Sequence, residues 1–416
     1  MPREPLADIE KKVRALRAKL NKPEKRGGEN RQVIVPASEA PNVYFLRRPS
    51  GIMSLDLDTA GGIPAGGLVY LSGPDGGGKT TLLYKYFAML QRLYGKKARI
   101  AYGLSEAAPD HLRMRGLGVQ VAVPDSTIEA MNQARKERGE APLSKEEEKE
   151  LKTEVGGIEI IRERSAERFL DVIVDAVESK AFDIVAADSI SALMPENEAG
   201  KDLDENPQMA AAAQALTRFF LHYLPNTTGF NGVNETTVFF ISQVRSNKKK
   251  SEAQAHMQKY MKDWAAQGAW AAKHGKLIDI CVWGGSKEKE AQKVTGALGE
   301  ESRDVRVAIS KTIHWEILKG KAGTHDGVTG EVEMSFQQPY FDDQRGILVA
   351  GLRRGVIRER DGLITVVRHG TGEVIEPLNN IAGADRFCDL LRSDFEVELQ
   401  VRREVLAASG IQCLYR

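Results

Sequence analysis

The sequence contains few cysteines and histidines, few aromatic residues and almost no net charge. Its three cysteines, Cys281, Cys388 and Cys413, are scattered without the spacing of metal ligands, and its seven histidines form no ligand pair. This pattern argues against a zinc site or a disulfide framework and predicts reduced, buried thiols in a cytoplasmic protein. Because the formal net charge is only +1, any positive surface for a nucleic acid must be local.

Long apolar runs are also absent. No run approaches the roughly 18 residues needed to cross a bilayer, and the first residues, Met1 to Glu4, lack the apolar core of a signal peptide. The chain has 416 residues, of which 42% are hydrophobic. This is enough for one large α/β domain with smaller appendages.

The clearest motif follows a short β-prone run at 69–71 and precedes a helical pattern. Its residues are Gly73, Pro74, Asp75, Gly76, Gly77, Gly78, Lys79, Thr80 and Thr81. A glycine, four residues and then Gly-Lys-Thr form the phosphate-binding loop pattern, and the strand–loop–helix context disfavours a chance Gly-rich turn. We expect the backbone N–H groups and the helix N-terminus to bind phosphate. Lys79 would reach the β- and γ-phosphates of ATP, and the Thr80 hydroxyl would bind Mg²⁺.

Further strand candidates alternate with helical stretches from about residue 43 to 345, which predicts a mostly parallel sheet with helices on both faces. Ligands bind at the carboxyl ends of such strands, where three polar residues occur. Glu106 follows the strand at 98–102 and is either a water-activating base or a surface carboxylate. Asp188 ends a buried strand and suits Mg²⁺. Gln243 ends another strand and could sense the γ-phosphate.

A polar segment follows Gln243. It contains the cationic and aromatic residues Arg245, Lys248, Lys249, Lys250, Tyr260 and Trp264. Cations followed by aromatic groups suit binding of a nucleic-acid strand, and a loop that starts at a phosphate sensor could move with nucleotide state. A solvated charge run beside a small amphipathic helix explains the same residues equally well.

Three regions flank or interrupt this core. At the N-terminus, Leu6, Ile9, Val13, Leu16 and Leu20 form one helical stripe, followed by a strand candidate at 33–35, and this arm either contacts a neighbouring subunit or folds back on its own core. The charged stretch 123–157 holds two capping-box patterns, Ser126…Glu129 and Ser144…Glu147, and predicts an exposed helical hairpin. Beyond residue 351, a β-hairpin turning at Asp361-Gly362 precedes helices at about 385–392 and 396–408.

Together these features resemble the RecA-type recombinases, most closely a divergent member such as a phage could encode. The similar stretches occur in the family's order and cover most of residues 43–345. They are residues 50–56 and 61–66 ahead of the phosphate loop, the loop itself, residues 187–195, and residues 240–245. The resemblance implies a RecA-like core at 43–350, an N-terminal oligomerisation arm at 1–42, and a small α+β domain at 351–416 that binds duplex DNA.

The resemblance also implies roles for single residues. Glu106 matches the general base, Gln243 the γ-phosphate sensor and Asp188 the ligand of the metal's water shell, and Asp110 is expected to contact the nucleotide. Lys319 and Lys321 match a pair that reaches the ATP site of the neighbouring subunit. About 196–209 and 246–268 correspond to the two DNA-binding loops.

The sequence also departs from the family. Leu104 stands where the family has an acid two residues before its base, and Gln267-Gly268-Ala269 replaces a glycine pair. We therefore expect a filament-forming recombinase that uses ATP and Mg²⁺ on single-stranded and duplex DNA. A hexameric helicase or translocase and an ATP-binding scaffold are the alternatives.

Overall fold

The computed structural model describes residues 6–20, 36, 46–105, 108–195, 210–220, 234–246, 264–266, 275–294, 303–321, 323–336, 340–411 and 414–415. Its central feature is a mixed sheet with the strand order β11-β10-β9-β3-β7-β6-β4-β5. The parallel strands are β3 (Gly67–Gly73), β4 (Arg99–Leu104), β5 (Gly157–Ile161), β6 (Ile184–Asp188), β7 (Thr237–Ser246) and β9 (Lys276–Val294). The expected mostly parallel sheet is confirmed.

One edge of the sheet is antiparallel, which the sequence pattern did not indicate. The strands β9 and β10 (Arg303–Gly320) form a long antiparallel pair, and β11 (Thr329–Ser335) pairs antiparallel with β10. A short strand, β8 (Trp264–Ala266), pairs with β7.

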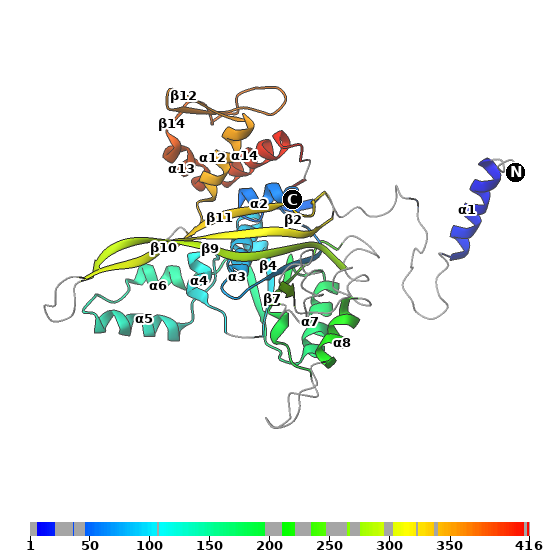
Figure 1. Cartoon of the computed structure of the whole chain (residues 1–416), viewed down its shortest axis with the longest axis horizontal. Helices are drawn as coiled ribbons and strands as arrows, with labels where there is room; N and C mark the ends of the chain where they lie inside the picture. Colours follow the sequence, from blue (N-terminus) through cyan, green and yellow to red (C-terminus); the bar gives the residue numbers. More distant parts are fainter. Residues whose placement is uncertain are drawn as a thin grey trace, which may run out of the picture.

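Helices cover both faces of the sheet because its strands alternate apolar side chains between two cores. Val69 and Leu71 of β3 face the core that contains α3 (Lys79–Tyr94) and α4 (His111–Gly116). Leu68 and Tyr70 face the other core, which contains α7 (Ala166–Glu178) and α8 (Ala210–Arg218). Figure 1 shows α7 and α8 together near β7, away from the strands β9–β11.

The segment 123–157 forms two helices, α5 (Asp125–Glu137) and α6 (Lys145–Leu151), as expected. The capping box of Ser144 and Glu147 is present at the start of α6. The prediction of a capping box at Ser126 is wrong, because α5 begins at Asp125, directly after Pro124 in the N-cap position. The helix therefore starts two residues earlier than it would with Ser126 as its N-cap, and Pro124 has the fixed φ that suits this position.

The N-terminal stripe forms helix α1 (Leu6–Leu20), on which Val13 and Leu16 are exposed. The strand expected at 33–35 lies outside the described residues. Short elements then lead into the sheet: β1 (Leu46–Arg48), α2 (Met53–Asp58) and β2 (Ile63–Pro64). The strand β15 (Leu414–Tyr415) returns to pair with β1, so the two ends of the described core meet.

The C-terminal residues build a third core on α12 (Asp343–Arg354), α13 (Ala384–Ser393) and α14 (Phe395–Ala408). The strands β12 (Ile357–Arg360) and β13 (Leu363–Val366) form the predicted hairpin, to which β14 (Ile381–Ala382) adds. Asp361 and Gly362 both have positive φ, 52° and 74°, as a two-residue type I′ turn requires. In Figure 1 these elements lie beyond the β11 side of the sheet.

A buried ion cluster joins this C-terminal core to the central one. Arg402 of α14 is fully buried and donates to Asp56 of α2 at 3.0 Å, to Glu398 at 3.0 Å, and to Asp343 of α12. Arg92, near the end of α3, donates to Glu398 at 2.8 Å. Four helices therefore share one charge network, in which each carboxylate offsets the desolvation of an arginine.

Two composition-based expectations can be compared with the structure. Cys281 and Cys388 are reduced, buried thiols, as predicted, whereas Cys413 is not among the described residues. Within the described part of the chain, no helix combines the length and apolar character needed to span a membrane.

Candidate nucleotide site

The phosphate loop leaves β3 at Gly73 and enters α3 at Lys79. Gly78 is the residue before α3 and has a φ of 107°, a left-handed conformation that favours glycine. A Cβ at Gly78 would also lie 2.8 Å from Cδ1 of Ile313. Lys79 is only 7% exposed, and its Nζ donates to the carbonyls of Gly73 at 3.0 Å and Pro74 at 2.8 Å. The ammonium group therefore lies inside the curve of the loop, where a phosphate would be bound.

Thr80 and Asp188 meet at the end of this loop. The Thr80 hydroxyl donates a 2.7 Å hydrogen bond to Oδ2 of Asp188, the last residue of β6. A hydroxyl and a carboxylate are the hard oxygen donors that Mg²⁺ prefers, so this pair fits a magnesium ion beside the loop. Within the described residues no group of three or more acidic, His or Cys side chains could hold a metal, and Mg²⁺ typically takes one or two protein ligands together with phosphate oxygens and water.

Tyr102 supports the same carboxylate, which the sequence did not indicate. Its hydroxyl donates to Oδ2 of Asp188 at 3.1 Å and lies 3.2 Å from the hydroxyl of Tyr84. Burial and the Asp188 charge raise the pKa of Tyr102 far above its usual value, so the phenol keeps its proton and remains a donor. Asp188 thus accepts hydrogen bonds from two elements, α3 and β4.

Ser105 joins the ends of β4 and β6. Its N–H donates to the Asp188 carbonyl at 3.2 Å, its hydroxyl donates to the Ser189 carbonyl at 2.5 Å, and Ser189 N–H donates back at 3.1 Å. Glu106 follows directly and lies outside the described residues. The chain is therefore held beside Asp188 one residue before the expected base.

Gln243 lies on the neighbouring strand of the sheet. Its position in β7 is in register with Gly73, the first residue of the loop, and its N–H donates to the Ser191 hydroxyl at 2.9 Å. Gln243, Lys79, Thr80 and Asp188 are thus gathered at the carboxyl ends of three adjacent parallel strands, as expected.

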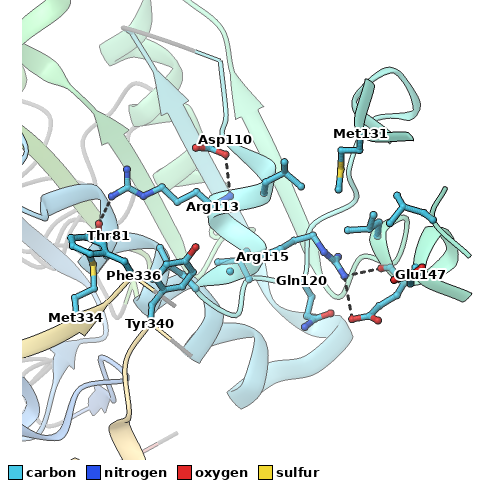
Figure 2. Close-up of a pocket in the computed structure, with 17 residues that line it drawn as sticks. Thr81, Asp110, Arg113, Arg115, Gln120, Met131, Glu147, Met334, Phe336 and Tyr340 are labelled. Atoms are coloured by element: carbon cyan, nitrogen blue, oxygen red, sulfur yellow. Dashed lines mark hydrogen bonds and ion pairs between the residues drawn. The ribbon is translucent and has the colours of Figure 1, made fainter. Parts of the chain in front are cut away.

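A cavity of about 940 Å³ opens beside the loop, and Figure 2 shows the side chains that line it. Thr81 and Asp110 both line it, and Arg113 connects them, donating its backbone N–H to Asp110 at 3.0 Å and its guanidinium to Thr81 at 2.6 Å. The far wall comes from α5 and α6, through Met131 and Glu147. The volume is in the range of small-molecule sites, so a ligand of that size would have room beside the loop.

The structure does not bring Lys319 and Lys321 to this loop. Lys319 of β10 pairs with Asp279 of β9, which pairs with Tyr70 of β3. Lys319 is therefore level with Tyr70, which is three residues or about 10 Å before Gly73 along β3. It is also two strands away from β3, about another 10 Å across the sheet. Lys321 lies farther from the loop than Lys319. Burial, followed by the charges of Lys321 and Lys276, lowers the pKa of Lys319.

The expected DNA-binding residues lie mainly outside the described part of the chain. This applies to Lys248, Lys249, Lys250 and Tyr260. The backbones of Arg245 and Trp264 are described and belong to the paired strands β7 and β8, in which Ser246 is in register with Trp264. Ser246 and Trp264, the described residues on either side of 247–263, are therefore next to each other.

Comparison with known proteins fits this arrangement. The chain is 28% identical to a RecA protein of Porphyromonas gingivalis over 242 residues, 58% of each chain. It is 28% identical to a RecA protein of Arthrospira platensis over 234 residues, which are 56% of this chain and 52% of the relative. It is 26% identical to a RecA protein of Gloeobacter violaceus over 240 residues, which are 58% of this chain and 53% of the relative. The fold is that of a RecA-like core. No family model matches the chain, and the matches span little more than half the length of these RecA proteins.

Lys311 is a further residue at the loop that the sequence did not reveal. It belongs to β10, and its Nζ donates to the Gly76 carbonyl at 2.5 Å. Lys311 and Tyr102 are distant in sequence from the motifs they contact and carry no motif of their own. The pairing of the strands brings Lys311 to the loop and Tyr102 to Asp188.

Proposed function

We propose that this chain is a DNA-dependent ATPase of the RecA type that forms filaments on single-stranded DNA. In this role it catalyses homologous pairing and strand exchange in the cytoplasm. The observation that carries the proposal is the separation of two sets of cations on one sheet. Lys79 lies at the carboxyl ends of the parallel strands, whereas Lys319 and Lys321 lie toward the opposite ends. A residue pair that cannot reach its own loop can serve the loop of the next subunit in a head-to-tail polymer.

The first half of the proposed site binds ATP within one protomer. The loop N–H groups and Lys79 hold the β- and γ-phosphates, and Thr81 and Asp110 face the nucleobase side, where the cavity opens. Thr80 and Asp188, 2.7 Å apart, would hold Mg²⁺, with Asp188 acting through water. Bound there, the ion would offset negative charge on the phosphates.

Hydrolysis in this proposal is attack of water on the γ-phosphorus. Glu106 accepts a proton from the water as the new O–P bond forms, the bond from the γ-phosphorus to the β–γ bridging oxygen breaks, and ADP carries the released electron pair. Ser105 supports this role for Glu106, since its hydrogen bonds to Ser189 fix the chain immediately before the base. Gln243 binds the γ-phosphate and loses that partner after hydrolysis.

The second half of the proposed site comes from the neighbouring protomer. Lys319 and Lys321 would approach the γ-phosphate and stabilise the charge of the transition state, as an arginine finger does. Burial, followed by the charges of Lys321 and Lys276, lowers the pKa of Lys319, and an incoming polyphosphate would relieve the repulsion between these lysines. Hydrolysis then depends on assembly.

The proposal links nucleotide to DNA through Gln243. The strand that contains Gln243 continues to Arg245 and then to the segment with Lys248 to Lys250, and that segment returns at Trp264 beside Ser246. A change at the γ-phosphate therefore has a short covalent path to the expected DNA-binding residues. Exposed arginines before, on and just after the C-terminal hairpin, Arg353, Arg354, Arg358, Arg360 and Arg368, support binding of duplex DNA there.

The decisive test measures ATP hydrolysis with single-stranded, duplex and no DNA, together with electron microscopy of the same samples. We expect single-stranded DNA to stimulate turnover and to carry helical filaments. Closed rings with ATP-driven translocation would instead identify a helicase or translocase. Nucleotide binding without DNA-stimulated turnover would identify a scaffold and overturn the proposal.

A further inference from the structure

A second lysine of the same protomer contacts the phosphate loop. Lys311 of β10 donates from Nζ to the Gly76 carbonyl at 2.5 Å. Gly76 is in the middle of the loop. Gly73 and Pro74, whose carbonyls accept from Lys79, come before it, and the start of α3 comes after it. Two ammonium groups from different elements therefore reach the loop at different points along its length.

The fold makes room for this side chain. A Cβ at Gly284 of β9 would lie only 3.3 Å from both Cε and Nζ of Lys311. The register of β9 and β10 also shifts between Lys311 and Ile313, so that two residues of β9 face one residue of β10. Irregularities of this kind change the direction in which side chains point. Here the Lys311 side chain extends to the phosphate loop.

The charges that act most strongly on Lys311 are positive. Lys287 is its register partner on β9, and Arg113 approaches from α4, where it donates to Thr81. Burial, followed by the charges of Lys287 and Arg113, lowers the pKa of Lys311. The nearest acid in the loop, Asp75, accepts from Gly76 N–H at 2.9 Å. An anion beside Gly76 would offset this clustering of positive charge.

We propose that Lys311 binds the phosphate chain of the nucleotide in cis, exchanging the Gly76 carbonyl for a terminal phosphate oxygen. The inference rests on the proposed ATP site and adds a third source of positive charge to it, besides Lys79 and the neighbouring protomer's lysine pair. Lys311 then discriminates between triphosphate and diphosphate before any neighbouring protomer is present.

The test is titration of a fluorescent N-methylanthraniloyl derivative of ATP or ADP with the full chain, without DNA. The Lys311→Gln variant retains an N–H donor for the Gly76 carbonyl but loses the charge. We expect it to weaken ATP binding by about ten- to a hundredfold, the range of one charged hydrogen bond, and to weaken ADP binding less. Lys311→Arg should bind ATP within about threefold of the wild type, because the charge is kept.

The control is Lys287→Gln, which removes the same charge from the register partner and should leave ATP binding within about threefold. Thermal unfolding of each variant checks folding. A Lys311→Gln variant that binds ATP as tightly as the wild type would show that Lys311 only supports the loop carbonyl. If Lys311→Gln binds ATP normally while Lys79→Ala abolishes ATP binding, the proposed ATP site stands and only the inference about Lys311 fails. A wild-type chain that binds neither nucleotide would overturn both.

Discussion

The Thr80 hydroxyl donates to the Asp188 carboxylate across 2.7 Å, joining the end of the phosphate loop to the end of β6. If this pair holds Mg²⁺, Asp188→Asn should weaken the stimulation of ATP hydrolysis by Mg²⁺ about ten- to a hundredfold, because the amide is a weaker partner for the ion's water shell. The measurement is a Mg²⁺ titration of turnover. ATP binding in EDTA should stay unchanged, and an unchanged Mg²⁺ dependence would remove Asp188 from the metal site.

Tyr102 gives a second test of the same carboxylate. Tyr102→Phe removes the 3.1 Å hydrogen bond to Asp188 and should raise the Mg²⁺ concentration for half-maximal turnover about tenfold. Tyr84→Phe is the matched control, since Tyr84 lies 3.2 Å from the Tyr102 hydroxyl and has no described bond to Asp188. Equal effects of the two variants would mean that packing, not the hydrogen bond, matters.

The separation of Lys79 from Lys321 predicts complementation between two inactive proteins. Lys79→Ala should abolish turnover, and Lys321→Ala should lower DNA-stimulated turnover at least about tenfold while leaving nucleotide binding by the free protomer near normal. In an equal mixture, about a quarter of the interfaces would combine an intact loop with an intact Lys321. We therefore expect the mixture to recover about a quarter of wild-type turnover on single-stranded DNA.

The outcome separates a shared site from a site within one protomer. If Lys321 acted on its own loop, each protomer in the mixture would carry one defect and no interface would recover. A Lys321→Ala variant that no longer binds nucleotide would likewise show that Lys321 does not act in trans. A mixture of Lys79→Ala with Lys79→Gln is the control and should stay inactive.

The buried ion cluster predicts a pH dependence of stability. Burial raises the pKa of Asp56 from 3.8 to about 6, against the opposing effect of Arg402. The unfolded chain therefore loses this proton first as pH rises, so the Asp56 contribution to stability is present below about pH 4 and is lost by about pH 6. The shift corresponds to about 3 kcal/mol.

Asp56→Asn removes this titration. Chemical denaturation between pH 4 and 7 should show the free energy of unfolding of the wild type falling relative to the variant by up to about 3 kcal/mol. Asp385→Asn, an exposed carboxylate paired with Arg345, is the control and should follow the wild type within about 0.5 kcal/mol. Parallel curves for wild type and Asp56→Asn would mean that Asp56 is not protonated in the folded state.

Local patterns predicted the parts of the site that lie within one motif. The phosphate loop, the strand ending at Asp188 and the hairpin at Asp361-Gly362 each depend on residues close together in the chain, and the structure has all three. The capping prediction at Ser126 failed for a local reason too, since Pro124 starts the helix earlier. The interpretation of the chain as phage-encoded stays a prediction.

The contacts that the sequence could not show depend on strand register. Lys311 reaches Gly76 across 235 positions of the chain, and it does so only because β9 and β10 shift register beside Gly284. Asp56 likewise meets its buried partner Arg402 from a helix near the other end of the chain. Hydrophobic periodicity predicts which face of a strand is buried, but it does not predict which strand or helix lies next to it. The contacts of Lys311 and Asp56 depend on that second kind of information.

Helix α3 has consequences beyond the loop from which it starts. It has 16 residues, about 24 Å at 1.5 Å per residue, with Lys79 at one end and Arg92 near the other. Arg92 donates to Glu398, which in turn pairs with Arg402. In the proposed ATP site, a pull on the first turn of this helix toward a γ-phosphate would be transmitted along its length to Arg92. The proposed nucleotide site would then be mechanically coupled to Glu398 and Arg402 on α14.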